Sequence, residues 1–167
     1  MKYISVFLAT IFIAICMEAQ NSSLLYAELK TIDGLPTSSE EIIEAGVVTI
    51  LVFWKTCNKD CRANLDALHE AWQEELEPRG VKMVAICVDG TGSLDHVKPL
   101  VYGNRWEFDT YVDVNCELKR AMNVNTVPCT LLFDDARQII CRHDGFCTGS
   151  EAILCEKIQG RAIAALD

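Results

Sequence analysis

The sequence predicts a three-layer α/β domain built around a mixed sheet, and three patterns lead to that prediction. Two largely apolar runs, 47–54 (VVTILVFW) and 81–88 (VKMVAICV), have the composition of strands that are covered on both faces. Between them, 59–77 carries leucine or tryptophan every three or four residues and glutamate on the other side, as an amphipathic helix does. Strands and helices alternate in this way until a hairpin closes the order.

The N-terminal elements follow from shorter signals. The segment 21–35 (NSSLLYAELKTIDGL) is typical of an edge strand with a turn. In the segment that follows it, Ser38 and Glu41 have the spacing of a capping box and Gly46 is a stop signal, so a short helix is expected there. The long helix should begin near Lys59 and end before Pro78 and Gly80.

The second half of the chain completes the pattern. We expect a helix over 93–103 (SLDHVKPLVYG), a short strand over 108–113 (FDTYVD) and a helical turn or two over 115–124 (NCELKRAMNV). The segment CTLLFDDARQIICRH predicts a β-hairpin around the polar turn 134–137. A final helix should begin near Ser150, with Ile153, Leu154 and Ile158 on its buried face.

The first twenty residues, MKYISVFLATIFIAICMEAQ, have the pattern of a secretory signal. The apolar run is too short to span a bilayer, so we expect a signal peptide over 1–19, cleaved before Gln20, and an exported mature chain without a transmembrane span. Lipid attachment at Cys16 is the alternative, although the bulky Ile15 precedes it. Residues 20–34 would form a linker and an edge strand, and 35–167 one domain. The location would be the periplasm or cell envelope.

The charge balance narrows the range of partners. With 24 acidic and 15 basic residues and no basic cluster, the chain offers no electrostatic footprint for nucleic acid or an anionic membrane. We therefore expect protein thiols and disulfides, or small thiols, as partners.

Eight of the nine cysteines follow the predicted cleavage site. An exported chain with an even number of cysteines can form a disulfide framework, but such frameworks belong to small domains that lack a core. Cys87, Cys141 and Cys155 lie in apolar runs, where a cysteine behaves as a small hydrophobic residue. Cys116 is expected to be an exposed thiol. A disulfide between Cys141 and Cys147 is possible, but the sequence does not establish it.

Two segments carry a family resemblance. FWKTCNKDCRANLDAL (53–68) resembles the FWATWCxPCRxELxxL segment of the TlpA-like thiol-disulfide oxidoreductases of the thioredoxin superfamily, and NVNTVPCTLLFDDARQII (123–140) resembles their second signature. The resemblance implies a thioredoxin-like α/β/α sandwich in which Val127 and Pro128 form a cis-proline loop facing the cysteine pair. It also implies that Trp54, Val127 and Pro128 line the substrate groove, and it implies no cofactor or metal.

The cysteine motif departs from that pattern. Cys61 aligns with the family's second cysteine, but Asn58 stands where the family has its attacking cysteine, and Cys57 falls one position earlier. Asparagine is a good N-cap, so a polar cap replaces the nucleophile. Two carboxylates usual in the family are also missing, since Asn64 and Val52 stand in their places.

Cys57 can replace the attacking cysteine only if the loop allows it. If the family backbone is kept, Cys57 stands near or beyond disulfide reach of Cys61. If the loop shifts by one residue, Thr56 can cap the helix and Cys57 can reach Cys61.

Three hypotheses follow. The first is an exported thiol-disulfide oxidoreductase with Cys57 as the attacking and Cys61 as the resolving thiol. The second is a redox-silent thioredoxin-fold binding module. The third is a copper-binding CxxxC site, for which Cys129 could supply a third thiolate. A peroxiredoxin is excluded by spacing, because its attacking cysteine comes three residues after a threonine and Lys59 holds that position after Thr56.

Overall fold

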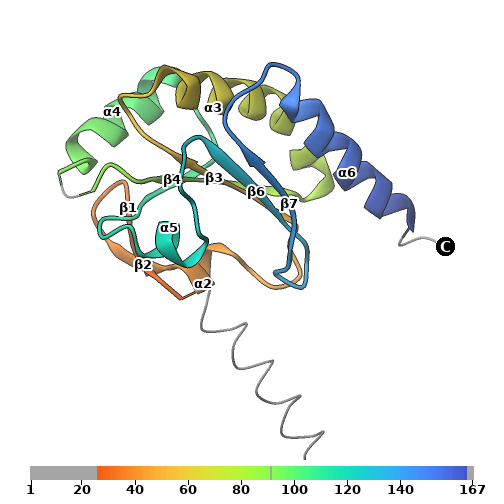
Figure 1. The fold of residues 1–167 in the computed structure, drawn as a ribbon, viewed down its shortest axis with the longest axis horizontal. Helices are drawn as coiled ribbons and strands as arrows, with labels where there is room; N and C mark the ends of the chain where they lie inside the picture. The colour runs from red at the N-terminus through yellow and green to blue at the C-terminus, as the bar shows by residue number, and fades with distance from the viewer. Residues whose placement is uncertain (1–25, 91, 165–167) are drawn as a thin grey trace, which may run out of the picture.

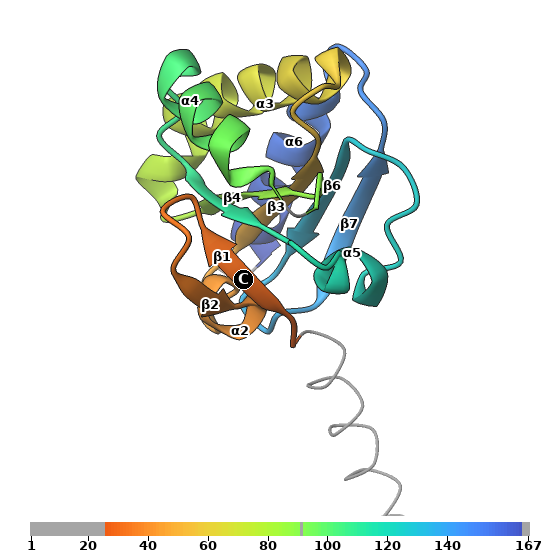
Figure 2. The ribbon, with the colours of Figure 1, turned by 90° about the vertical axis from the view of Figure 1, so that its left-hand side faces the viewer.

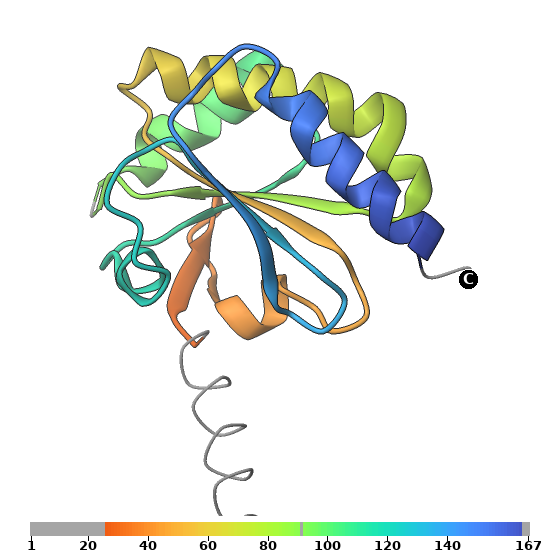
Figure 3. The ribbon, with the colours of Figure 1, turned by 45° about the vertical axis from the view of Figure 1, so that its right-hand side comes forward.

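The computed structural model describes residues 26–90 and 92–164, and they form a single seven-stranded mixed sheet with helices on both faces (Figure 1). This confirms the predicted three-layer α/β/α fold. Helices α3, α4 and α6 cover one face, and α2 and α5 cover the other (Figure 3). The signal peptide, the Gln20 cleavage point and Cys16 lie outside the described residues.

The strands run in the order β2-β1-β5-β4-β3-β6-β7. Their bounds are Glu28–Thr31 (β1), Pro36–Ser38 (β2), Thr49–Trp54 (β3), Lys82–Cys87 (β4), Asp109–Val112 (β5), Cys129–Phe133 (β6) and Ile139–Asp144 (β7). The pairs β3–β4 and β4–β5 are parallel, while β3–β6 and β6–β7 are antiparallel. The two apolar runs of the sequence are thus β3 and β4, side by side at the centre.

The helical segments lie where the sequence places them. Their bounds are Ser39–Ile42 (α2), Lys59–Ala71 (α3), Leu94–Asn104 (α4), Glu117–Ala121 (α5) and Ser150–Ala164 (α6). A π-helical turn, Trp72–Leu76, and a 3₁₀ turn, Glu77–Arg79, continue α3 to Gly80, whose φ of 77° ends the helix. Figure 2 shows the same layers end-on, with α3 and α4 above the sheet and α2 and α5 below it.

The prediction of an edge strand in 21–35 is wrong in position. β1 lies between β2 and β5, pairing with both in antiparallel register, and the three-residue β2 forms the edge. The chain reverses after β1 through a turn in which Gly34 has a φ of 82°. The predicted strand therefore exists, but the short segment after it protects its outer side.

The predicted capping box of α2 does not form. Ser38 is the N-cap residue, but its side chain makes no capping hydrogen bond. Glu41 instead accepts a 2.6 Å hydrogen bond from the Thr37 hydroxyl. The hydroxyl of Ser39 accepts from the backbone N–H of Ala27, and so ties α2 to the segment before β1.

The core has two parts because side chains alternate along β3. Ile50, Val52 and Trp54 pack with α3, α4 and α6 on one face of the sheet. Leu51 and Phe53 pack with α2 and α5 on the other. All five are fully buried, which explains why β3 from Ile50 to Trp54 is a continuous apolar run instead of an alternating one.

The predicted hairpin and last helix are both present, and one predicted buried residue of the helix is wrong. Asp134 Oδ1 accepts hydrogen bonds from the N–H groups of Ala136 and Gln138, which fixes the turn between β6 and β7. Leu154 and Ile158 on α6 are buried as expected, but Ile153 is 52% exposed and its predicted burial is wrong. Among the described residues, no helix has the length and apolar character needed to cross a bilayer.

Candidate functional site

The strand-to-helix corner lies between β3 and α3. β3 ends at Trp54, and the N–H of Asn58 donates to the carbonyl of Lys55 over 3.3 Å, which closes a four-residue turn. Asn58 Oδ1 accepts hydrogen bonds from the N–H groups of Asp60 (2.8 Å) and Cys61 (3.2 Å), so Asn58 is the N-cap of α3. The loop therefore keeps the arrangement in which the asparagine caps the helix, and Thr56 does not take that role.

The two cysteines of the corner have opposite environments. Cys57 lies in the turn and is exposed, whereas Cys61, in the first turn of α3, is fully buried. Burial, with a smaller contribution from the carboxylates of Asp89 and Asp60, raises the pKa of Cys61 to about 11. A hydrogen bond from the backbone of Lys55 acts in the opposite direction. Both thiols are free, so the pair is in its reduced state.

The loop before β6 faces the same corner. The Val127–Pro128 peptide bond is cis, in the position that the resemblance implies. Asn58 Nδ2 donates to the carbonyl of Val127 over 3.4 Å, so one side chain both caps α3 and contacts the proline loop. Of the three residues assigned to a substrate groove, Trp54 and Pro128 are buried and only Val127 is partly exposed. Cys57 and Val127 are thus accessible from solvent, whereas the ring of Trp54 is not.

Asp89 belongs to the corner, and sequence reasoning missed it. It follows β4 by two residues, and its Oδ2 accepts hydrogen bonds from both the N–H (2.8 Å) and the hydroxyl (2.7 Å) of Thr56. The thiol of Cys87 donates to the same oxygen over 3.5 Å. The only signal in the sequence is an acidic residue directly after a buried strand, at the sheet edge where β3 also ends.

The position of the missing glutamate is occupied by a structural contact. Asn64 is buried, and its Nδ2 donates to the hydroxyl of Thr130 on β6 over 3.3 Å. Val52, in place of the buried aspartate, packs in the core against α3. With neither of the usual carboxylates present, the two carboxylates that oppose ionisation of Cys61 are Asp89 and Asp60, and Asp89 has the larger effect.

The comparisons with known proteins agree with this geometry. The AhpC/TSA family matches residues 23–142, which is well over half of the chain. The chain belongs to the AhpC/TSA family. Among curated proteins, none matches the chain.

Solved structures place this AhpC/TSA member among the thioredoxin-superfamily redoxins. An uncharacterized thioredoxin-like protein from Porphyromonas gingivalis is 33% identical, with a TM-score of 0.70 over 80% of this chain and 88% of that one. StoA from Bacillus subtilis (23% identity, TM-score 0.63, 78% and 94% covered) shares the fold. A protein from Chlorobium tepidum described as a putative thiol:disulfide interchange protein DsbE also shares the fold (21% identity, TM-score 0.66, 85% of this chain and 94% of that one covered).

Cys129 of this redoxin lies on the other face of the sheet from Cys61. Cys129 packs with Phe53 and Leu131, whereas Cys61 packs with Val52 and Trp54. The two thiols are thus separated by the sheet and cannot share a metal ion. Within residues 26–90 and 92–164, no three histidine, cysteine or acidic side chains form a cluster that could hold a metal.

The other cysteines of this redoxin within the described residues are free thiols. Cys87 and Cys155 are buried, as predicted, and Cys141 is partly exposed. Cys116 was expected to be an exposed thiol and is partly exposed. Cys147 is exposed and is not bonded to Cys141.

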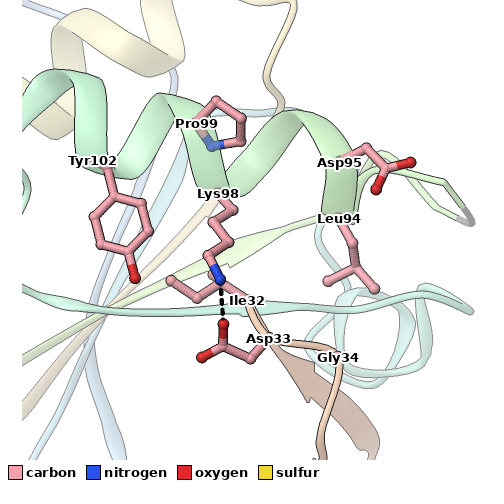
Figure 4. A pocket seen from close by; sticks show the side chains of 8 residues that line it. All are labelled: Ile32, Asp33, Gly34, Leu94, Asp95, Lys98, Pro99 and Tyr102. Carbon is pink, nitrogen blue, oxygen red and sulfur yellow. Dashed lines mark hydrogen bonds and ion pairs between the residues drawn. The ribbon is translucent and has the colours of Figure 1, made fainter.

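A cavity of about 610 Å³ lies away from the corner, between the β1–β2 turn and α4 (Figure 4). An ion pair between Lys98 Nζ and Asp33 Oδ1 (2.5 Å) joins α4 to the β1–β2 turn, and the Lys98 ammonium lies 5.9 Å from the centroid of the Tyr102 ring. None of the lining residues belongs to the Lys55–Asn58 turn or to the proline loop. The cavity is therefore separate from the cysteine pair.

Proposed function

We propose that the protein is an exported thiol-disulfide oxidoreductase that exchanges disulfides with protein clients, with Cys57 as the attacking thiol and Cys61 as the resolving thiol. The observation that carries this proposal is the contrast at the corner: one thiol is exposed in the turn, and the other is buried one helical turn later. An attacking thiol must be accessible, and a resolving thiol is protected from solvent until the mixed disulfide forms. The family and the cis-proline loop support the same chemistry.

The proposed reaction has two exchanges. The Cys57 thiolate attacks one sulfur of a client disulfide, a bond forms between Cys57 and the client, and the second client sulfur leaves as a thiolate that takes a proton from solvent. Cys61 then loses its proton and attacks the sulfur of Cys57, which releases the first client sulfur. The client is reduced by two electrons, and Cys57 and Cys61 become a disulfide.

We expect the turn to change when that disulfide closes. A bridge needs Cα atoms about 4.4 to 6.8 Å apart with converging side chains, and in the reduced state Thr56 and Asn58 are each held by other partners. The shift in which Thr56 caps α3 would free Asn58 and bring Cys57 towards Cys61. A bridge made in this way would be strained and easily reduced.

A tryptic map of the oxidised protein tests the proposal. Cleavage after Lys55, Lys59 and Arg62 places Cys57 in the peptide TCNK and Cys61 in the peptide DCR, so their bridge appears as one linked pair. We expect this pair after incubation with oxidised glutathione. The Cys61→Ala variant should stop at a mixed disulfide on TCNK, and Cys147→Ala, which removes an exposed thiol elsewhere, should change nothing. Absence of the linked pair would contradict the proposal.

A redox-silent binding module is the second candidate, and the hydrogen bonds of Asn58 favour it. Its side chain satisfies two N–H groups of α3 and the carbonyl of Val127, so the corner is stable without a reactive thiol at the cap. This candidate predicts that Cys57 and Cys61 stay free in oxidising buffer and that the protein does not reduce insulin. The same tryptic map, together with an insulin assay, separates the two functions.

Export is the remaining part of the proposal, and the first twenty residues support it. Expression with the full N-terminus in a bacterial host should give a processed chain that begins at Gln20. A chain that begins at a lipid-modified Cys16 would identify the lipoprotein alternative. An unprocessed chain in the cytosolic fraction would contradict export.

A further inference from the structure

Asp89 holds the residue that directly precedes Cys57. Its Oδ2 accepts two hydrogen bonds from Thr56, one from the backbone at 2.8 Å and one from the hydroxyl at 2.7 Å. Asp89 lies 33 residues further along the chain and reaches the turn because β4 pairs in parallel with β3, with Cys87 opposite Trp54. A single carboxylate oxygen therefore fixes one end of the turn.

The other end of the turn is fixed by Asn58. Its side chain is bound to α3 and to the proline loop, so the residues on both sides of Cys57 are held in the reduced state. Arg62 adds a weaker contact, from Nη1 to the carbonyl of Thr56 at 3.4 Å. For Thr56 to replace Asn58 as the cap of α3, its hydroxyl must first leave Asp89.

Asp89 also acts on Cys61 through its charge. The groups that affect this buried thiol come from three places: Asp89 after β4, Asp60 on α3, and Cys57 and the Lys55 backbone in the turn. Asp89 and Asp60 are both negative and disfavour the thiolate, while the Lys55 N–H favours it. Of the two carboxylates, only Asp89 is bonded to the turn.

We propose that Asp89 is a positioning residue that keeps the cysteine pair in its reduced, open form by anchoring the turn through Thr56. The negative charge of Asp89 acts in the same direction, because it opposes the proton loss that Cys61 needs in order to close the bridge. This inference rests on the proposed function. Asp89 would thus influence the cysteine pair without contacting the client. Asp89 should slow the resolving step and shift the equilibrium towards the dithiol.

The test compares the resolving step in the wild-type protein with that in Asp89→Asn. The reduced protein is mixed with oxidised glutathione, the reaction is stopped with acid, and glutathione on TCNK and the linked TCNK–DCR pair are counted at several pH values. A fall of one unit in a thiol pKa makes the thiolate ten-fold more abundant and, after its lower nucleophilicity, speeds attack about three-fold. We expect Asp89→Asn to give an increase of that order at pH 7 and to move the pH profile to lower pH.

Two further variants separate charge from anchoring. The asparagine side chain can still accept a hydrogen bond from Thr56, whereas Asp89→Ala cannot, so Asp89→Ala should close the bridge faster than Asp89→Asn and favour the disulfide more at equilibrium with glutathione. Asp95→Asn removes an exposed acidic group from α4 and should match the wild type. Asp89→Asn remains informative if Asp89→Ala does not fold.

The outcomes distinguish this inference from the proposed function. If the wild-type protein never forms the linked pair, both the proposed function and the role of Asp89 are overturned. A linked pair with the same pH profile and the same glutathione equilibrium in wild type and Asp89→Asn would overturn the role of Asp89 alone. If the role of Asp89 were purely structural, Asp89→Asn would lower the stability of the protein without moving the pH profile of the resolving step.

Discussion

The side chain of Asn58 makes three hydrogen bonds at the point where the family resemblance leads one to expect a cysteine. Its Oδ1 satisfies two N–H groups at the start of α3, and its Nδ2 donates to the carbonyl of Val127. The first N–H groups of a helix have no partner within the helix, so a cap of this kind contributes about 1 kcal/mol of stability. Asparagine at this position thus supplies no nucleophile, but it stabilises the junction between α3 and the proline loop.

Returning a thiol to this position should restore a family-like pair. In Asn58→Cys, the new thiol would lie at the start of α3 with two residues between it and Cys61, where the helix dipole and the free N–H groups lower a thiol pKa. We expect insulin reduction at least ten-fold faster than for the wild type, at a cost of about 1 kcal/mol in stability from the lost cap.

Asn58→Ser is the matched control for this substitution. It keeps an oxygen that can cap α3 but adds no sulfur, so its insulin activity should equal that of the wild type or fall below it. If the serine and cysteine variants reduced insulin at the same rate, the position would not be able to support an attacking thiol.

Sequence reasoning placed the corner, the asparagine cap and the proline loop, because each depends on neighbours within a few residues or on a familiar motif. It missed Asp89, whose contact with Thr56 exists only because two parallel strands end at the same sheet edge. It also assigned Trp54 to a groove, although alternation along β3 directs this side chain into the core, where it meets Trp106 edge-on with ring centroids 5.6 Å apart.

Among the elements, α2 shows how a local signal can be overruled. The spacing of Ser38 and Glu41 predicted a capping box, but Glu41 bonds to Thr37 and the neighbouring Ser39 bonds to the backbone of Ala27. Those contacts join α2 to the strands at the sheet edge. A helix of four residues gains more from such tertiary contacts than from its own cap.

The end of α3 depends on a tertiary contact as well. Sequence periodicity gave the extent of the helical segment, but the π-helical turn at Trp72–Leu76 was not predicted. The indole Nε1 of Trp72 donates to the buried carbonyl of Val81 over 2.7 Å, which joins the end of the helix to the chain that enters β4. This bond ties the long helix to the central strands.

Removing that bond should destabilise the protein measurably. Trp72→Phe keeps an aromatic ring but leaves the carbonyl of Val81 without its donor in a buried place, so we expect the free energy of unfolding in urea to fall by about 1–3 kcal/mol. Trp106→Phe is the control, because the acceptor of its indole is the exposed carboxylate of Asp66, which water can solvate instead. An equal or larger loss in the control would show that ring packing, and not the hydrogen bond, sets the cost.

Across the whole molecule, buried thiols make the folded state sensitive to alkaline pH. Burial raises the pKa of Cys61 to about 11 and that of Cys87 and Cys129 to about 12, from an ordinary value of 9.0. These thiols lie on both faces of the sheet. Because the folded state holds their protons more tightly than the unfolded state, their contribution to stability is complete below pH 9 and is lost as the pH rises through the folded pKa values.

Urea unfolding in reducing buffer at pH 7 and pH 10 should show this loss. Above pH 9, the unfolded chain releases each of these protons while the folded chain keeps them, so each thiol lowers the free energy of unfolding by up to about 1.4 kcal/mol per pH unit. Cys129→Ala removes one such thiol, and the difference between the two pH values should shrink by about that amount. Cys147→Ala removes an exposed thiol and should leave the difference unchanged. If Cys129→Ala kept the full wild-type difference, the alkaline loss would have to come from other groups, such as the tyrosines and lysines that both proteins share.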